Sequence, residues 1–187
     1  NKVHVPLKDA QTWGTLWNRK YRGKLLMKDS YRDSYGTALI WAHRKDLEAG
    51  KVTVPELMND YSPNAVAMVE KNLKALKPNI EGWEADFGKE TMTKGKAYLN
   101  MTWSGDAVWA IEEAKNVGVE LGYEVPKEGS NVWFDGWAIP KYAKNPKAAA
   151  YFINYLCQQD VALANMETTG YVSSVAGKKI LDAMSNQ

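Results

Sequence analysis

Short apolar runs alternate along this chain with stretches of helical spacing, and this alternation constrains the fold more than any other feature. Lys24 to Lys28 (KLLMK) is apolar except at its ends, as expected for a strand buried within a sheet. The pattern changes to helix directly afterwards, where Ser30 followed by Asp33 resembles a capping box. Residues 80–85 and 97–102 also read as strands, and each precedes a predicted helix. The sequence therefore predicts an α/β fold with a mostly parallel sheet.

The rest of the chain fits the same alternation. Residues 126–131 (PKEGSN) form a polar loop of turn residues, which is the best candidate for a crossing between two lobes. Residues 43–53 are predicted to be a surface connection. Further helices are predicted at 10–20, at 64–76, from the turn at 103–107 to about residue 116, and at 146–157, 159–168 and 176–184. Short helical turns are predicted at 55–59 and 86–95. Two further strands are predicted at 119–125 and 132–140.

The last predicted strand, Val132 to Pro140 (VWFDGWAIP), combines aromatic residues with one acid. On a strand, alternate side chains share a face, so Trp133, Asp135 and Trp137 would point the same way. A buried carboxylate without a partner costs several kcal/mol, so we expect Asp135 to have a cationic or donor partner or to reach water. A carboxylate beside aromatic faces is a receptor for an organic ammonium ion. The alternative is a core strand whose Asp135 accepts hydrogen bonds from a neighbouring loop.

Two polar junctions follow predicted strands. In parallel α/β sheets, ligands bind beyond the carboxyl ends of the strands. Asp29 to Asp33 (DSYRD) follows one strand, and Trp103 to Asp106 (WSGD) follows another. Helix capping alone explains the presence of Ser30 and Asp33, and such a cap contributes about 1 kcal/mol of stability. A bound ligand would instead use the same side-chain oxygens. Trp103 is either a stacking platform for a ligand or a lid on the core.

Composition argues against several classes of protein. The formal net charge of the 187 residues is +2 without a basic run, which argues against a nucleic-acid partner. Eight Trp and ten Tyr are many for this length, and such residues line ligand clefts as well as cores. Cys157 is the only cysteine, so no internal disulfide and no CxxC site can form. No apolar run approaches the length of a membrane span.

Catalytic signatures are few. His4 and His43 lie far apart in the sequence, and there is no HExxH, GxSxG or cysteine–histidine motif. No cluster of metal ligands occurs, and no cofactor is expected. An α/β enzyme using Asp33 or Asp135 as a base is therefore the weaker alternative to a binding protein. A structural module that interacts through its aromatic surface is a third.

Several stretches together resemble the polyamine-binding proteins of spermidine/putrescine ABC transporters. The resemblance covers nearly the whole chain, and its most specific part is the PKEG–WFDGWAIP block. The matching stretches are 12–17 (TWGTLW), 21–26 (YRGKLL), 29–33 (DSYRD), 103–107 (WSGDA), 123–129 (YEVPKEG), 133–140 (WFDGWAIP), 143–145 (AKN), 152–156 (FINYL) and 169–171 (TGY).

The resemblance implies a two-lobed fold like that of the type II periplasmic binding proteins, with a mixed sheet, flanking helices and hinge closure on a ligand. It implies a polyamine held between aromatic walls, Trp103 and Trp133, with Asp135 anchoring an amine. Asp33 stands where the family commonly has a glutamate at another amine site. Ser30 stands where an aspartate is often found, which would replace an ion pair by a neutral hydrogen bond. An ABC permease is the implied partner, and the periplasm or the outer face of the cytoplasmic membrane is the implied location.

The resemblance also implies that most of the first lobe is missing, and that the chain is processed or a piece of a longer protein, as its start at Asn1 suggests. By the family's topology, residues 1–131 would form the second lobe. Residues 132–170 would cross into the first lobe, and residues 171–187 would return. We expect weak or no polyamine binding by this chain alone, and exposed apolar surface that could drive dimerisation or segment swapping. A binding protein for another cationic or sugar-like solute is the alternative, because such folds are reused.

Overall fold

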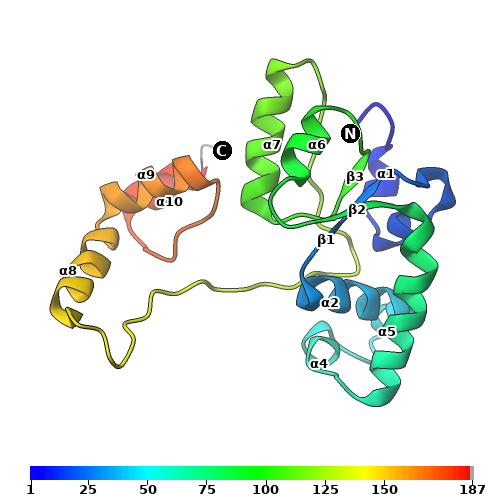
Figure 1. Ribbon diagram of the computed structural model, residues 1–187, viewed down its shortest axis with the longest axis horizontal. Helices are drawn as coiled ribbons and strands as arrows, with labels where there is room; N and C mark the ends of the chain where they lie inside the picture. Colours follow the sequence, from blue (N-terminus) through cyan, green and yellow to red (C-terminus); the bar gives the residue numbers. More distant parts are fainter. Residues whose placement is uncertain (186–187) are drawn as a thin grey trace. The chain divides into compact units, whose positions relative to one another are not determined.

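The structure, a computed structural model, describes residues 1–185 and divides into two units, which are considered separately. Unit 1 spans Asn1–Val132 and unit 2 spans Trp133–Gln187. Figure 1 shows the elements of each unit in chain order. Residues 186 and 187, which end the predicted 171–187 return segment, lie outside the described residues. The assignment of the three predicted segments to two lobes stays a prediction.

Unit 1 is built on a sheet of three parallel strands, β1 (Leu25–Lys28), β2 (Ile80–Glu84) and β3 (Leu99–Asn100). Strand β1 lies in the middle of the order β2-β1-β3, and Leu26 is paired with Gly82 on one side and Asn100 on the other. The α/β class and these three predicted strands are confirmed. The expectation of a mixed sheet is wrong for the described residues, because every strand pair there is parallel.

Helices cover both faces of this sheet (Figure 1). Leu26 packs in a cluster with residues of α6 (Gly88–Thr93) and α7 (Ser104–Asn116). Its neighbours Leu25 and Met27 point to the opposite face, as strand alternation requires, and pack with Leu76 of α5 (Pro63–Leu76). Helix α2 (Tyr31–Ala42) contacts α5 through a third cluster. The central strand is therefore buried on both faces.

The short helices differ in part from the predictions. The helix predicted at 10–20 is replaced by α1 (Leu7–Ala10) and two 3₁₀ helices, η1 (Trp13–Trp17) and η2 (Arg19–Tyr21). The connection predicted at 43–53 contains a helix, α3 (Arg44–Glu48). The remaining short elements are α4 (Val54–Met58), whose first turn is closed by a capping box of Thr53 and Glu56, and η3 (Lys77–Asn79).

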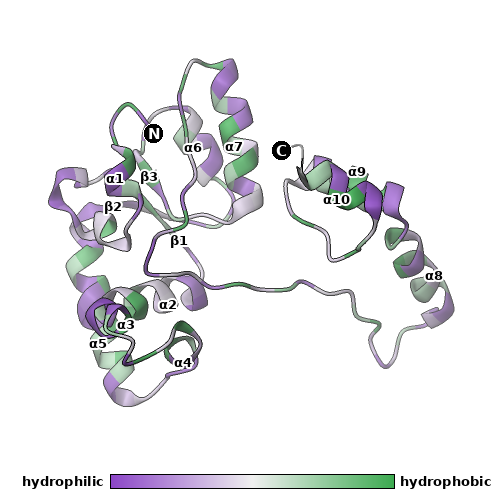
Figure 2. Ribbon diagram, turned by 180° about the vertical axis from the view of Figure 1, so that it is seen from behind, coloured by the Kyte–Doolittle hydropathy of each residue, from purple (hydrophilic) through white to green (hydrophobic). Residues whose placement is uncertain are grey.

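Unit 2 contains three helices in its described part, α8 (Pro146–Leu156), α9 (Gln159–Thr169) and α10 (Lys178–Ser185). Helices α9 and α10 share a small core of Ala162, Met166 and Ile180. Gly170 ends α9 with a φ of 73°, a left-handed conformation that glycine adopts without strain. Helix α8 buries none of its residues, although Figure 2 shows hydrophobic positions along it.

The strands predicted at 119–125 and 132–140 are wrong, because neither segment forms a ladder in the described residues. A strand is stable only when its backbone N–H and C=O groups pair with another strand, and neither segment lies in the order β2-β1-β3. Residues 132–140 are instead exposed along their whole length. None of the described helices is long and apolar enough to cross a membrane.

Candidate functional site

The two polar junctions meet at one edge of the sheet in unit 1. Strands β1 and β3 are parallel neighbours, so their carboxyl ends lie side by side. The chain leaves β1 through Asp29 and Ser30 into α2, and it leaves β3 through Trp103 into α7. Ser30 caps α2, because its Oγ accepts a hydrogen bond from the Asp33 backbone N–H at 3.4 Å. The capping predicted for Ser30 is therefore confirmed, but the predicted capping box is not completed, because the Asp33 side chain bonds to Trp103 and Asn131 instead.

The carboxylate of Asp33 is held by two neutral donors. The indole Nε1–H of Trp103 donates to Oδ2 at 3.0 Å, and the side-chain amide of Asn131 donates to Oδ1 at 2.9 Å. The bonds fix the direction of the carboxylate but leave its negative charge uncompensated, since Asp33 forms no ion pair within residues 1–185. Each carboxylate oxygen has a further lone pair available for another donor.

A buried charge network lies beside Trp103. The ammonium group of Lys28 lies 3.8 Å from the centre of the Trp103 ring. It also forms ion pairs with Glu84 at 3.3 Å and Asp106 at 3.7 Å, and it donates to the carbonyl of Ala85 at 2.7 Å. The structure thus places a cation against the indole for which the sequence left open a ligand platform or a core lid, and which the resemblance implied to be a ligand wall.

Asn131, Lys28 and Glu84 were not identified from the sequence as site residues. Lys28 and Glu84 each end a short strand, which is a weak signal for a position at the carboxyl edge of the sheet. Asn131 closes the polar loop 126–131, and it lies 98 positions from its partner Asp33. Pairings over such separations depend on the fold and leave no local pattern.

Trp133 and Asp135 belong to unit 2 and form a separate group. Trp133 is 40% exposed, and Asp135 is exposed without a hydrogen bond or ion pair to the part of the chain that the structure describes. Trp137 contacts Phe152 of α8 edge to face, with ring centres 6.0 Å apart. The structure brings Ser30, Asp33 and Trp103 together in unit 1, and it leaves Trp133 and Asp135 accessible in the other unit.

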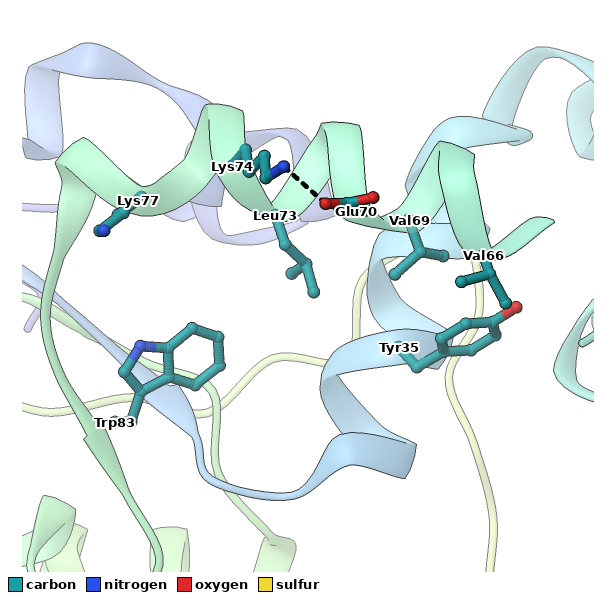
Figure 3. A pocket seen from close by; sticks show the side chains of 8 residues that line it. All are labelled: Tyr35, Val66, Val69, Glu70, Leu73, Lys74, Lys77 and Trp83. Carbon is teal, nitrogen blue, oxygen red and sulfur yellow. Dashed lines mark hydrogen bonds and ion pairs between the residues drawn. The ribbon is translucent and has the colours of Figure 1, made fainter. Parts of the chain in front are cut away.

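Unit 1 also has a recess whose lining includes none of Ser30, Asp33 and Trp103. It is an apolar groove of about 430 Å³ between α2, α5 and β2 (Figure 3). Its one acid, Glu70, is already paired with Lys74, and Lys77 adds a further positive charge. This charge balance is unfavourable for a ligand amine. The groove is lined by Tyr35, Val66, Val69, Glu70, Leu73, Lys74, Lys77 and Trp83.

Comparisons with known proteins agree with this architecture. The family model for bacterial extracellular solute-binding proteins matches residues 1–179. The spermidine/putrescine-binding periplasmic protein of Escherichia coli is 33% identical over 178 residues, which is 95% of this chain and 47% of that protein. The corresponding protein of Salmonella typhimurium is 33% identical over 182 residues, covering 97% of this chain and 48% of the relative.

A solved structure shares the fold. The substrate-binding protein PotD of a spermidine/putrescine ABC transporter from Streptococcus pneumoniae superposes with a TM-score of 0.69 at 28% identity. The match covers 96% of this chain and 52% of that structure. The chain thus spans about half the length of the curated relatives it matches. Since the family model covers nearly all of its residues, the chain belongs to the bacterial extracellular solute-binding proteins.

Proposed function

We propose that this chain is part of the solute-binding component of an ABC importer for polyamines such as spermidine and putrescine. The observation that carries the proposal is the Asp33 carboxylate, which has no cationic partner within residues 1–185 and is fixed against the indole of Trp103 at the carboxyl ends of β1 and β3. The relatives named above are binding proteins of such importers, which supports a role in capture and release without chemistry.

The chemistry of a polyamine suits these groups. A polyamine is a chain of ammonium groups separated by methylenes, so its receptor needs spaced carboxylates and flat apolar walls. In this proposal Asp33 accepts one ammonium group, Trp103 contacts the adjoining methylenes, and Ser30 adds a neutral hydrogen bond. Charge-assisted hydrogen bonds of this kind contribute about 1.5–3 kcal/mol each.

Trp133 and Asp135 supply a second acid and a second wall in the proposal. Both side chains are exposed in unit 2, and Asp135 has no partner in the described residues, so its carboxylate is available to a ligand amine. The rest of the ligand contacts would come from the half of the relatives' length that this chain does not span. We therefore propose that this chain alone binds polyamines weakly or not at all.

Location and partners follow from the same proposal. The protein would work in the periplasm or at the outer face of the cytoplasmic membrane, and it would deliver its ligand to an ABC permease. The exposed aromatic residues of α8, among them Tyr151 and Phe152, could pair two copies of this chain. Light scattering on the 187-residue chain tests that part: a dimer supports it, and a monomer at high concentration contradicts it.

Calorimetry with putrescine and spermidine on the protein of full length tests the binding function. We expect heat of binding, and Asp33→Ala and Asp135→Ala should each weaken it by about 10- to 100-fold, the equivalent of one charge-assisted hydrogen bond. Trp133→Ala should weaken it as well. Asp160→Ala, which removes an exposed acid of unit 2, is the matched control and should leave affinity unchanged. Absence of heat from every diamine and polyamine, with a response to a sugar instead, would overturn the proposal.

A further inference from the structure

Lys28 is the most deeply buried cation at the sheet edge, and the ligand proposal above does not use it. Its side chain is 1% exposed and that of Glu84 is 2% exposed. Burying a lysine is costly unless every proton of its ammonium group has a partner. Here the partners are the carboxylates of Glu84 and Asp106, the carbonyl of Ala85 and the face of Trp103.

The charges around Lys28 cancel. Asp106 also pairs with Lys89 at 3.7 Å, so the network consists of two lysines and two acids. Three carboxylates contact either Lys28 or Trp103, namely those of Glu84, Asp106 and Asp33. Within residues 1–185, only Asp33 among these three lacks a cationic partner.

Lys28 also determines what can stack on Trp103. A ring that already holds a cation at 3.8 Å on one face attracts a second cation on its other face less, because the two like charges repel each other across the ring. Methylene groups carry no such penalty, and the half-buried indole remains partly accessible to them. Asp33, at the edge of the same indole, is then the place for the ligand's ammonium group.

We propose that Lys28 is a built-in cation that, together with Lys89, cancels the charges of Glu84 and Asp106, so that unit 1 receives one ligand ammonium group at Asp33 and stacks ligand methylenes on Trp103. This inference rests on the proposed polyamine function. Lys28 touches no ligand in this scheme; it is a specificity-determining residue that acts through the charge of the network and the face of the indole.

A charge series on the full-length protein tests the proposal with putrescine as the probe. Glu84→Gln keeps the acceptor for the Gly88 backbone N–H and gives the network a charge of +1. Lys28→Met gives it −1, and the double variant Lys28→Met/Glu84→Gln returns it to zero without a buried charge on either residue. Lys115→Met removes one charge from an exposed ion pair at the far end of α7 and is the control. Thermal unfolding of every variant is measured in parallel.

The affinity for putrescine should rise as the net charge of the Lys28 network becomes more negative. We expect Glu84→Gln to weaken putrescine binding by roughly fivefold, Lys28→Met to bind roughly fivefold more tightly than the double variant, and Lys115→Met to match the unchanged protein. If Lys28→Met fails to fold, the double variant must still bind more tightly than Glu84→Gln. Equal affinities for Glu84→Gln and the unchanged protein, or losses that follow only the unfolding temperature, would show Lys28 to be a purely structural residue and overturn the inference. If the unchanged protein binds no amine, the proposed function itself fails and this inference with it.

Discussion

Two tryptophan–aspartate pairs occur in this chain, and their surroundings differ. Trp103 and Asp33 hydrogen-bond to each other at the edge of a sheet whose central strand is buried on both faces. Trp133 and Asp135 lie on a segment without regular structure, and both are exposed. The same residue types therefore form a preorganised site only where the chain itself provides the neighbouring strands and a second hydrogen-bond donor, here the Asn131 amide. Trp133 and Asp135 have no neighbouring strand among the described residues.

The largest expected effect is a difference in stability between two variants, each of which replaces one apolar residue in one of the two regions. Leu26→Ala, in the buried central strand, should lower the free energy of unfolding by about 2–5 kcal/mol. Ile139→Ala, on the exposed segment, should cost less than about 1 kcal/mol in this chain. Chemical denaturation of both variants measures the difference.

The same pair of variants can sharpen the comparison in the protein of full length. If the segment 132–140 gains a partner strand there, Ile139→Ala should become clearly more costly than in this chain. Equal costs for Leu26→Ala and Ile139→Ala in the 187-residue chain would contradict the exposure of the segment.

Local signals explain which parts of this difference were predictable. The apolar run 24–28 and the cap at Ser30 act on their immediate neighbours, so β1 and the start of α2 were predicted correctly. Residues 132–140 have strong strand propensity, but a strand also needs a partner, and propensity carries no information about one. The segment is therefore irregular in the structure despite its composition.

The site was predictable only in part for the same reason. The position of Asp33 and Trp103 beyond parallel strands followed from the alternation of strands and helices. The bond from Asn131 to Asp33 and the pairing of Lys28 with Glu84 join residues 98 and 56 positions apart. No periodicity or motif relates residues at such separations, so these contacts become visible only in the folded chain.

A second comparison uses glycines in the two regions. An added Cβ at Gly88 would lie 2.4 Å from Cδ of Glu84 and 2.7 Å from the amide nitrogen of Asn100. Glu84 belongs to the charge network of Lys28, and Asn100 lies on β3. Gly88→Ala should therefore cost about 1–3 kcal/mol through overpacking, and it should weaken ligand binding by disturbing Glu84 and Lys28. Gly136→Ala is the matched control, because nothing lies within 4 Å of its added Cβ. The unfolding temperatures of the two variants should differ in this chain, and calorimetry on the full-length protein should show weaker binding for Gly88→Ala than for the unchanged protein; no difference in either measurement would mean that the charge network tolerates displacement.

Ser30 allows the cap to be separated from the ligand contact. Ser30→Ala should cost about 1 kcal/mol of stability, because the Asp33 backbone N–H loses its acceptor. Ser30→Asp keeps a good capping group, so stability should stay near that of the unchanged protein. The added carboxylate should strengthen spermidine binding by up to about tenfold, since a charge-assisted hydrogen bond replaces a neutral one. Weaker binding in Ser30→Asp, with the fold intact, would remove Ser30 from the ligand site.

The smallest expected effect is a pH dependence that arises from Asp9 and Tyr21 of unit 1. The Tyr21 hydroxyl donates to Asp9 at 2.7 Å, and this bond holds the pKa of Asp9 below its usual range. Burial, together with the same bond, raises the pKa of Tyr21 well above its usual range. The stabilisation from Asp9 is present above its unfolded pKa of about 4 and is lost as the pH falls through its lower folded value. The stabilisation from Tyr21 is present below about pH 10 and is lost as the pH rises toward its higher folded value.

Thermal unfolding as a function of pH measures this contribution. At neutral pH, Asp9→Asn should unfold at a lower temperature than the unchanged protein, because its amide accepts the Tyr21 hydrogen bond without the carboxylate's charge. The difference should shrink as the pH falls below about 4, and it should be lost once the pH has passed the lower folded pKa of Asp9, where the native carboxyl is also neutral. Asp160→Asn removes an exposed ion pair of unit 2 and should change the unfolding temperature less at neutral pH. A difference between Asp9→Asn and the unchanged protein that stays constant down to strongly acidic pH would mean that geometry, and not the charge of Asp9, makes the Tyr21 contact favourable.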